Sequence, residues 1–545
     1  MSLEFQQDDI SPTMTTVRTA PTGLSLNQIA RAAAVVMLSY VLTGVLGIVR
    51  QAAIGAHFGL GAELDAYNAA NRVSETLFTL ISGGALSSAF IPIFSRFLNR
   101  DDARGAWQLA SVVATVIGVV GLLLTLLAIL LARPIVATLL VPQADAVQQA
   151  LTVRLMRPML GTVVIFGLSG LSMAILNAHH RFLAAALAPS LYNGGLIVGA
   201  LIFAPLWGID GLALGTLLGA TLHLGVQLPT LIRLPGAAAR LRPSLMLRTE
   251  GTADVLRLML PRVLGLGVVQ INFWVNAALT SGMTPGSLTA LTSAFALLFT
   301  VLGVLGQSVG TAVFPTLAAL SADADTDRFR QVLGSALRGV LFMAIPATVG
   351  LIVLAGPLVA TIYQHGAWTA TSTEATAWAL RWYGIGLVGF ALQEVLARAF
   401  YALNDTLTPV VIGVVGVILN IGLSLSLMRI VQGADTAQGP FGGLALANAL
   451  ATIIESAALW LLVRRQIGGS GDIAILQVGL RVLVAALGMG IVVYGVMTLL
   501  GSDLPLLTLA ISGVIGVATF ELLALLLGLA EARRIPAMLL RRVRR

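Results

Sequence analysis

The chain has no cysteine, and none of its 32 basic residues is a lysine. The absence of cysteine excludes disulfide bonds, thiol catalysis and cysteine-ligated metal sites. Charged residues are also scarce: they make up 10% of the 545 residues, whereas a soluble protein carries about 25%. Together with 57% hydrophobic residues and a mean hydropathy of +0.93, this scarcity excludes a soluble enzyme and indicates a polytopic membrane protein.

Long apolar segments account for most of the chain. A membrane-spanning helix needs about 20 mostly apolar residues, and the sequence offers fourteen such segments, so we expect an all-α bundle of fourteen transmembrane helices. The segments lie near residues 29–55, 65–95, 106–132, 150–176, 182–204, 208–232, 255–280, 288–320, 332–360, 376–402, 408–429, 441–463, 474–499 and 503–530.

The arginines fall mainly in alternate connections, after spans two, four, six, eight and twelve and at the end of the chain. The connections after spans three and eleven hold one each, Arg133 and Arg429. Because basic loops stay on the cytoplasmic side, this pattern predicts that both termini are cytoplasmic and that the number of spans is even. The net charge of +8 is then explained by anionic lipid and not by nucleic acid.

Three sequence patterns recur along the chain. Phe90-Ile91-Pro92 resembles Phe314-Pro315, Leu176-Asn177 resembles Leu403-Asn404, and Gly211-Leu212-Ala213-Leu214 returns as Gly443-Leu444-Ala445-Leu446. The pairs lie 223, 227 and 232 residues apart. Two six-helix repeats of the same orientation are therefore expected, as in transporters whose substrate binds between two halves.

The repeats and the loops between them predict six regions. They are a cytoplasmic tail (1–26, not a signal peptide), an N-lobe (27–235), a basic cytoplasmic linker (236–254), a C-lobe (255–467), two additional helices (468–531) and a basic tail (532–545).

Polar residues in the spans form stripes at helical spacing. In span two the steps are three and four residues, which places Asp65, Asn68, Arg72, Glu75, Thr79 and Ser82 on one face. We favour a water-lined face, because a charge inside a membrane usually faces a cavity or a partner. The alternative is that Arg72 and Glu75 neutralise each other and only fix helix packing.

Four other spans carry smaller polar sets. The set of span eight could equally serve close helix packing; it comprises Ser293, Ala296, Thr300, Gly303, Gln307 and Gly310. Span one offers Arg50 behind Thr43 and Gly47, although Arg50 is also placed to extend toward the outer surface. Arginine suits phosphate because its planar group offers paired donors. The arginines of spans one, two and seven, which are Arg50, Arg72 and Arg262, therefore predict an anion-binding cavity. Glu394 and Arg398 are spaced for an ion pair that is structural or part of a gate. Span seven carries Arg262, Gln270, Asn272 and Asn276.

No catalytic constellation is present, so the chain is not expected to be an enzyme. The adjacent His179 and His180 lack a third ligand nearby, and no metal site is predicted. A phosphate-binding GxxxxGK[ST] loop is also missing. We therefore expect no bound cofactor, and energy from an ion gradient (for example of a coupled monovalent cation), from membrane potential or from downstream consumption of the product.

Several segments together resemble the MurJ (MviN) family of lipid II flippases, in the multidrug/oligosaccharidyl-lipid/polysaccharide exporter superfamily. They extend from span one to span eleven. The matching residues are Val45-Leu46-Gly47-Ile48-Val49-Arg50, Phe58-Gly59, Asp65-Ala66-Tyr67, Gly84 to Pro92, Ile175-Leu176-Asn177, Arg181-Phe182, Ala188-Pro189, Pro261, Gln270-Ile271-Asn272, Phe400-Tyr401-Ala402, Asp405, Thr408 and Pro409.

The resemblance implies a V-shaped, two-lobed bundle that alternates between inward-facing and outward-facing states. Its cargo would be lipid II, the undecaprenyl-pyrophosphate-linked peptidoglycan precursor, moved to the outer leaflet of a bacterial inner membrane. The two additional helices would form a groove for the polyprenyl tail, and the protein is expected to act as a monomer.

The resemblance also assigns candidate site residues. Arg50 and Asp65 match family positions, and Arg72 lies where the family commonly has a basic residue. Other family positions differ: two arginines are replaced by Phe78 and Ala296, Glu-Gly-Ala by Gly83-Gly84-Ala85, and Ser-Arg by Thr43-Gly44. Substrate contacts are expected from Arg50, Arg72, Arg262, Gln270 and Asn272, and gating or charge pairing from Asp65, Glu75, Glu394 and Arg398.

Because of these substitutions, alternatives remain open. One is a flippase for another polyprenyl-linked glycan, such as an O-antigen or teichoic-acid precursor. Another is a non-transporting paralogue that acts as a scaffold. A drug/cation antiporter of the same superfamily is disfavoured, because it would call for unpaired acidic residues in the lobes and no thirteenth and fourteenth spans, and the sequence shows neither.

Overall fold

All regular secondary structure in the described residues is helical. The computed structural model describes residues 26–81, 85–235, 241–246, 248–433, 435, 437–469, 471–501 and 504–532. Within them, the side chains of residues 26–37, 40, 85, 87, 88, 261, 262 and 264 are not described. Nearly all of both predicted tails, part of the predicted linker and the side chain of Arg262 thus lie outside the description.

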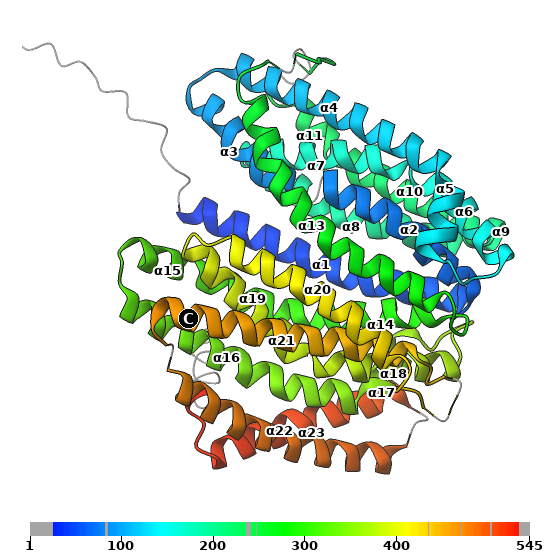
Figure 1. The fold of residues 1–545 in the computed structure, drawn as a ribbon, viewed down its shortest axis with the longest axis vertical. Helices are drawn as coiled ribbons and strands as arrows, with labels where there is room; N and C mark the ends of the chain where they lie inside the picture. Colours follow the sequence, from blue (N-terminus) through cyan, green and yellow to red (C-terminus); the bar gives the residue numbers. More distant parts are fainter. Residues whose placement is uncertain are drawn as a thin grey trace, which may run out of the picture.

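The first half of the chain forms one bundle, which is drawn in blue to cyan in Figure 1. Its α-helices are α1 (Leu26–Phe58), α2 (Ala62–Ile81), α3 (Ala85–Asn99), α4 (Ala103–Leu130), α5 (Ala132–Ile135), α6 (Ala146–Met159), α7 (Thr162–Ala178), α8 (Phe182–Val198), α9 (Ala204–Trp207), α10 (Ile209–Gly225) and α11 (Leu228–Ile232). Two π-helical turns, η1 (Val136–Leu140) and η2 (Gly199–Phe203), interrupt them.

The second half forms another bundle, to which two further helices are added. It contains α13 (Thr252–Thr280), α14 (Ser287–Leu302), η3 (Gly303–Gln307), α15 (Ser308–Ala322), α16 (Thr326–Val353), α17 (Ala355–Tyr363), α18 (Ala370–Ile385), α19 (Leu387–Ala402), α20 (Leu407–Leu427) and α21 (Phe441–Ile467). The added helices, α22 (Asp472–Leu500) and α23 (Pro505–Leu526), pack on α16 at the bottom of Figure 1.

Eleven helices among the described residues are long and apolar enough to cross a membrane, and there are up to 13 spans if two bent pairs count as one span each. The bends are 43° within α13 and 47° between α18 and α19. The segment expected at 65–95 is divided into α2 and α3, neither of which is among these spans. The protein is therefore a polytopic, all-helical membrane protein, and the count of fourteen stays a prediction.

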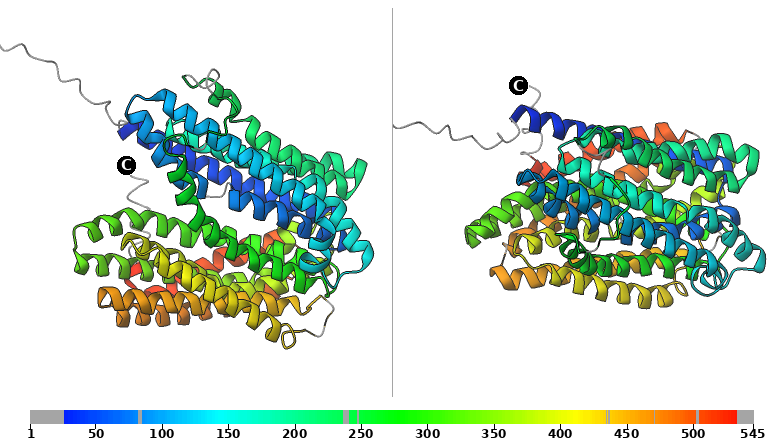
Figure 2. Two further views of the ribbon diagram at one scale, coloured as in Figure 1. Left: turned by 45° about the horizontal axis from the view of Figure 1, so that its top comes forward. Right: turned by 90° about the horizontal axis from the view of Figure 1, so that it is seen from above.

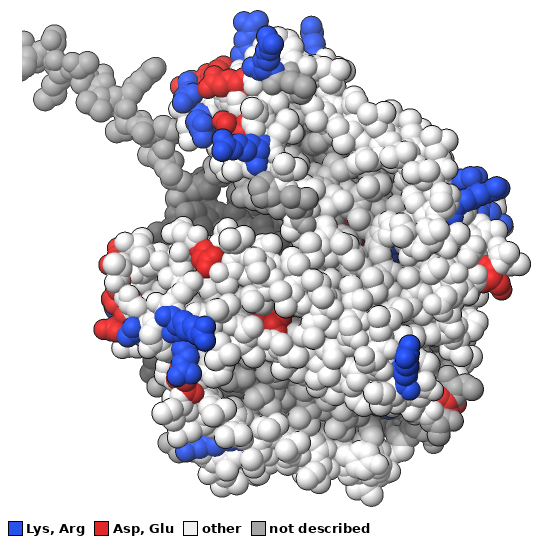
Figure 3. Space-filling model, viewed as in Figure 1, with Lys and Arg blue, Asp and Glu red and all other residues white. Residues whose placement is uncertain are grey.

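Charges gather toward the two ends of the helices, and the surface between them in Figure 3 is largely uncharged. Large apolar side chains such as Leu130, Leu499 and Ile491 are exposed on the outside of the bundles. In water, so much exposed apolar surface would be unfavourable. Against the hydrocarbon chains of a membrane, the exposure of these apolar side chains is favourable.

The buried apolar side chains form separate cores for the two bundles and for α22 with α23. Val255 and Ala277 of α13 belong to the core of the first bundle, although α13 follows that bundle in the chain. Figure 2 shows the bundles farther apart at the end with α3 and α15 and closer at the end with α9 and α18. We call the closer end, where α9 and α18 lie, the gate end. The opposite end, where α3 and α15 lie, we call the basic end, because Arg96, Arg100, Arg328 and Arg330 are there.

The same local structures recur in both bundles. Helices α4 and α16 each have 28 residues, and an aspartate caps each N-terminus: Asp102 accepts from the Gly105 N–H and Asp325 from the Arg328 N–H. The preceding residue has a positive φ in both bundles, 55° at Asp101 and 56° at Ala324. Equivalent caps and turns at a constant offset are what two copies of one unit would produce.

The recurring glycines provide a second correspondence. A Cβ atom on Gly211 would lie 2.4 Å from the carbonyl carbon of Phe203, and one on Gly443 would lie 2.5 Å from that of Leu427. Both contacts join the start of one helix to the end of the preceding span. Each glycine is therefore required because two backbones touch at that position.

Candidate functional site

The carboxylate of Asp65, on α2 of the first bundle, lies at the N-terminus of α14 in the second. Its Oδ2 accepts a hydrogen bond from the Gly286 N–H (2.7 Å), and its Oδ1 accepts from the N–H (2.8 Å) and the hydroxyl (2.6 Å) of Thr289. Asp65 is only 5% exposed. The first N–H groups of a helix lack partners and carry partial positive charge, so Asp65 caps a helix of the other bundle.

Further contacts close the gate end around this cap. Asn68 Nδ2 donates to Thr289 Oγ1 (3.0 Å), and the Ala367 N–H donates to the Ala56 carbonyl (2.8 Å). Gly366 has a φ of +58°, and a Cβ atom there would lie 2.2 Å from the Ala56 oxygen. The two bundles thus touch backbone to backbone, and a side chain at Gly366 would separate them.

Arg72 lies farther along α2, between the two bundles. Its Nη1 donates to Glu75 Oε2 (2.9 Å), its Nη2 contacts Thr292 Oγ1 of α14 (3.4 Å), and its guanidinium lies 4.9 Å from the ring centre of Phe273 on α13. The side chain is 14% exposed, whereas that of Glu75 is 45% exposed. Arg72 is therefore a cation held by three helices, with its acidic partner open to solvent.

The stripe predicted on α2 is real, but its role changes along the helix. Asp65 and Asn68 contact α14 directly, so this part of the stripe is a contact between bundles and is not lined by water. Arg72 and Glu75 follow at the more open part. Ser82 lies outside the described residues.

On α13, the predicted residues have different environments. Gln270 Oε1 accepts from the hydroxyl of Thr76 on α2 (3.3 Å), to which the Trp274 indole N–H also donates (2.8 Å). Asn272 has a buried Oδ1 with no hydrogen-bond partner among the described residues. Gln270 is thus part of the contact between α13 and α2, and Asn272 keeps an acceptor for another group. Arg262 lies in the helix, but its side chain is not described.

Arg50 lies on the face predicted from Thr43 and Gly47, and that face packs on α8. Arg50 Nη1 donates to Asn193 Oδ1 (3.0 Å), while Asn193 Nδ2 donates to the Thr43 carbonyl (3.1 Å). Ser190 lies 2.8 Å from the Thr43 hydroxyl. Arg50 Nε is buried without a partner among the described residues. The structure therefore assigns Arg50 a contact within the first bundle that the sequence pattern did not indicate.

Glu394 and Arg398 form the predicted ion pair on α19. Arg398 also donates to the Glu394 carbonyl and contacts Thr311 Oγ1 of α15 (3.4 Å). The pair lines a cavity of about 490 Å³ together with Gln393 and Tyr401. Its lining residues all belong to α15 and α19, so the pair is not part of the group around Asp65 and Arg72 on α2, α13 and α14.

Glu455 is a polar residue of the second bundle that the sequence reasoning missed. Its Oε1 accepts from Gln393 Nε2 (2.6 Å), and a Cβ atom on Gly416 of α20 would lie 2.7 Å from its Oε2. The available signal was a single carboxylate in the apolar segment 441–463. Gly416 leaves room for that carboxylate between α20 and α21.

Among the residues described, no three His, Cys, Asp or Glu side chains are arranged to hold a metal ion. Arginine, amide and hydroxyl groups between two bundles can instead bind an anionic or hydrogen-bonding ligand and release it when the bundles move.

Two helical bundles that meet at one end around a polar contact define a multi-span membrane protein with a transporter fold. The profile of the family described as Lipid II flippase MurJ matches residues 54–512. The chain belongs to this family.

Relatives agree with this assignment. Lipid II flippase MurJ of Burkholderia cenocepacia is 32% identical over 387 residues, 70% of this chain and 75% of that protein. A protein of Bdellovibrio bacteriovorus named Probable lipid II flippase MurJ is 30% identical over 512 residues, 92% and 95% of the two chains. The solved structure "Lipid II flippase MurJ, inward closed conformation" superimposes with a TM-score of 0.75 at 25% identity, covering 90% of this chain and 97% of that one.

Proposed function

We propose that this chain is a lipid II flippase, which moves the undecaprenyl-pyrophosphate-linked peptidoglycan precursor to the outer leaflet of a bacterial plasma membrane. The observation that carries the proposal is Arg72, a cation held between the bundles by α2, α13 and α14 in a chain of the MurJ family. A planar guanidinium offers the paired donors that a pyrophosphate accepts.

The topology is part of the proposal. If α2 and α3 together cross the membrane, they add one span to the 13 counted with the bent pairs, and both termini lie in the cytoplasm. The gate end then faces outward. The recurring caps of α4 and α16 and the recurring contacts of Gly211 and Gly443 support two parallel repeats of six spans.

Transport follows from breaking and remaking the gate. With the bundles joined at Asp65 and Thr289, cargo enters from the basic end. Its pyrophosphate contacts Arg72, together with Arg262 and Asn272. Arg50 contributes positive charge from the α1–α8 contact. Opening to the outside requires α14 to leave Asp65, and Glu75 restores a partner to Arg72 once the cargo has gone.

The remaining elements complete the proposal. Gln270 leaves Thr76 and binds the cargo headgroup. The Glu394–Arg398 pair changes partners as α15 and α19 move. Helices α22 and α23 hold the polyprenyl tail in a groove outside the cavity. Membrane potential or a monovalent cation supplies the energy, and the chain acts as a monomer with no enzymatic step.

A second candidate is a flippase for a different polyprenyl-linked glycan, or a scaffold that no longer transports. Its specific support is Phe78, which stands at a family arginine position and packs on Phe166 with ring centres 4.7 Å apart. Fewer cations between the bundles would suit a cargo with a different headgroup.

The deciding experiment is complementation in a bacterium depleted of its own lipid II flippase. The full chain and its Arg72→Gln variant are expressed, and membrane insertion is checked by blot. We expect the unaltered chain to restore growth and to deliver lipid II to the outer leaflet, and Arg72→Gln to fail at equal insertion. Failure of the unaltered chain despite normal insertion would favour the second candidate.

A further inference from the structure

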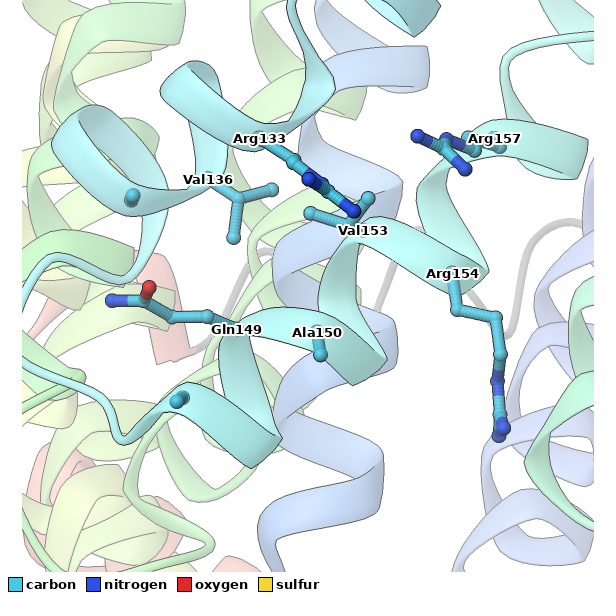
Figure 4. A pocket seen from close by; sticks show the side chains of 9 residues that line it. Arg133, Val136, Gln149, Ala150, Val153, Arg154 and Arg157 are labelled. Carbon is cyan, nitrogen blue, oxygen red and sulfur yellow. The ribbon is translucent and has the colours of Figure 1, made fainter.

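A cavity of about 450 Å³ lies on the outside of the first bundle, away from the contact between the bundles. It is formed by the turn after α4 and by α6, and Arg133, Arg154 and Arg157 line it beside Gln149 and Val153. Figure 4 shows this cavity. Helix α4 runs from the basic end to the gate end, so the cavity lies at the gate end.

The three arginines differ in their partners. Arg154 forms an ion pair with Asp210 of α10 at 3.0 Å. Among the described residues, neither Arg133 nor Arg157 forms an ion pair. In the view of Figure 4, Arg133 and Arg157 extend toward one another, and Arg154 extends away from them. The cavity therefore holds two positive charges with no acidic partner in the part of the chain that the structure describes.

Such a cluster is unexpected on this side of the membrane. Basic residues are retained on the cytoplasmic side, and in the proposed topology the connections at the gate end hold few arginines. Uncompensated positive charges repel one another, and two side chains that converge on one cavity increase that repulsion. A bound anion would remove this cost, because a phosphate accepts hydrogen bonds from two guanidinium groups at once.

The position of the cavity indicates that the anion belongs to a lipid. Helices α6 and α7 form a single candidate span of 33 residues. That is about 50 Å of helix, against a hydrocarbon core of about 30 Å. The excess lets the α6 part lie at headgroup depth. Around the cavity, Leu130, Leu139 and Val147 are 79%, 51% and 78% exposed, which offers apolar surface to acyl chains.

We propose that Arg133 and Arg157 bind the phosphate of an anionic phospholipid headgroup in the outer leaflet, at a site separate from the contact between the bundles around Asp65 and Arg72. The inference goes beyond the proposed function, because it concerns a lipid that stays bound and is not carried. A lipid held there would fix the turn after α4 against α6 while the two bundles move.

The test compares lipid retention by the full-length protein. The chain is purified in mild detergent, mixed with equal amounts of phosphatidylglycerol and phosphatidylcholine, and examined by native mass spectrometry. The test variant is Arg133→Gln/Arg157→Gln. Arg429→Gln is the matched control, because Arg429 is also an exposed arginine at the gate end but belongs to the second bundle.

We expect the unaltered chain and Arg429→Gln to retain phosphatidylglycerol in preference to phosphatidylcholine. The double variant should lose this preference by about fivefold for each arginine. Arg133→Lys/Arg157→Lys should keep part of it, since lysine preserves the charge but not the paired donors. All four proteins should elute at the same volume in size-exclusion chromatography, since both arginines are exposed.

Two results would overturn the inference. One is equal phosphatidylglycerol retention by the double variant and Arg429→Gln. The other is inorganic phosphate that displaces phosphatidylglycerol and raises the melting temperature of the lipid-free chain, which would indicate a site for soluble phosphate. Complementation is scored separately, so failure of the flippase proposal would leave the lipid measurement unaffected, and the reverse also holds.

Discussion

Asp65 and Thr289 join α2 of the first bundle to α14 of the second through two hydrogen bonds of 2.8 and 2.6 Å. The carboxylate is buried and caps a helix that begins 222 residues later in the chain. A buried charge that loses its donors is costly. The contact therefore strongly favours the closed state of the gate end. The gate end opens only when other groups or water replace the donors to Asp65.

Asp65→Asn should loosen the gate end. The amide keeps an acceptor oxygen but loses the negative charge at the α14 N-terminus, and a hydrogen bond to a charged group contributes about 1.5–3 kcal/mol. The chain lacks cysteine, so a single Ser287→Cys reports on the site directly, because Ser287 is 1% exposed. We expect labelling by a membrane-impermeant maleimide to become roughly tenfold faster in Asp65→Asn.

Asp210→Asn serves as the control for this experiment. It removes a carboxylate near the same end, but one that pairs with Arg154 inside the first bundle. Its labelling rate should equal that of the parent Ser287→Cys protein. Equal rates in Asp65→Asn and Asp210→Asn would show that the cap does not hold the gate closed.

The contacts of Arg72 predict how its substitutions rank. Arg72→Lys keeps the charge near Glu75 and Phe273 but loses the paired donors, so it should retain part of the complementing activity. Arg72→Gln removes the charge and should reduce activity by at least tenfold, about 1.4 kcal/mol, at an unchanged protein level. Growth and outer-leaflet lipid II measure the outcome. Full activity of Arg72→Gln would remove Arg72 from the proposed site.

Arg50 has two possible roles, and its partner Asn193 separates them. Both Arg50→Ala and Asn193→Ala break the contact between α1 and α8. If Arg50 contributes charge to cargo binding, Arg50→Ala abolishes complementation at a normal protein level, while Asn193→Ala retains activity. We expect this result. Equal losses of activity and of melting temperature in both variants would limit Arg50 to packing.

The spacing of polar residues predicted a face of α2, but not what that face contacts. Steps of three and four residues place Asp65, Asn68 and Arg72 together on any helix. Their partners Thr289 and Thr292 are more than 200 residues away in the chain, and a local pattern contains no information on such contacts. The water-lined face expected for this stripe is therefore wrong at Asp65 and Asn68 and stays a prediction at Arg72 and Glu75.

Composition predicted the all-helical membrane fold, because a mean hydropathy of +0.93 leaves few alternatives. The repeat signal was also local, since Gly211 and Gly443 are small for the same packing reason. Arg50 was identified as a candidate but without its partner, and Glu455 was missed. A charged residue in an apolar segment shows that a partner is needed, but Asn193 and Gln393 became visible as partners only once the helices were placed.

Glu394 and Arg398 should be energetically coupled. Both side chains are about one quarter exposed, so removing one partner leaves a partly buried charge without compensation. Glu394→Gln and Arg398→Gln should each lower stability by about 1 kcal/mol, and the double variant should lower it by less than their sum. The stability of each variant is measured by thermal unfolding in detergent, with loss of monodispersity as the readout. Additive losses would contradict a direct pair.

Asp405, in the turn before α20, predicts a pH dependence of stability. The Thr408 hydroxyl donates to its Oδ2 (2.6 Å) and the Thr408 N–H to its Oδ1 (3.0 Å), and these bonds hold the pKa of the Asp405 carboxyl below its ordinary value of 3.8. A carboxyl with a lowered folded-state pKa stabilises the protein above its unfolded pKa, and this contribution is lost as the pH falls through the folded pKa.

The melting temperatures of the unaltered chain and Asp405→Asn should therefore differ by a constant amount near neutral pH and converge below about pH 4. Thr408→Val removes the hydroxyl donor, so the pKa of Asp405 should return toward its ordinary value. The stabilisation present near neutral pH should then be smaller, and its loss should be complete at a higher pH than in the unaltered chain. Melting curves across an acid pH series, in one detergent, measure all three proteins. A difference between the unaltered chain and Asp405→Asn that persists unchanged into acid would show that the carboxylate charge does not stabilise this turn.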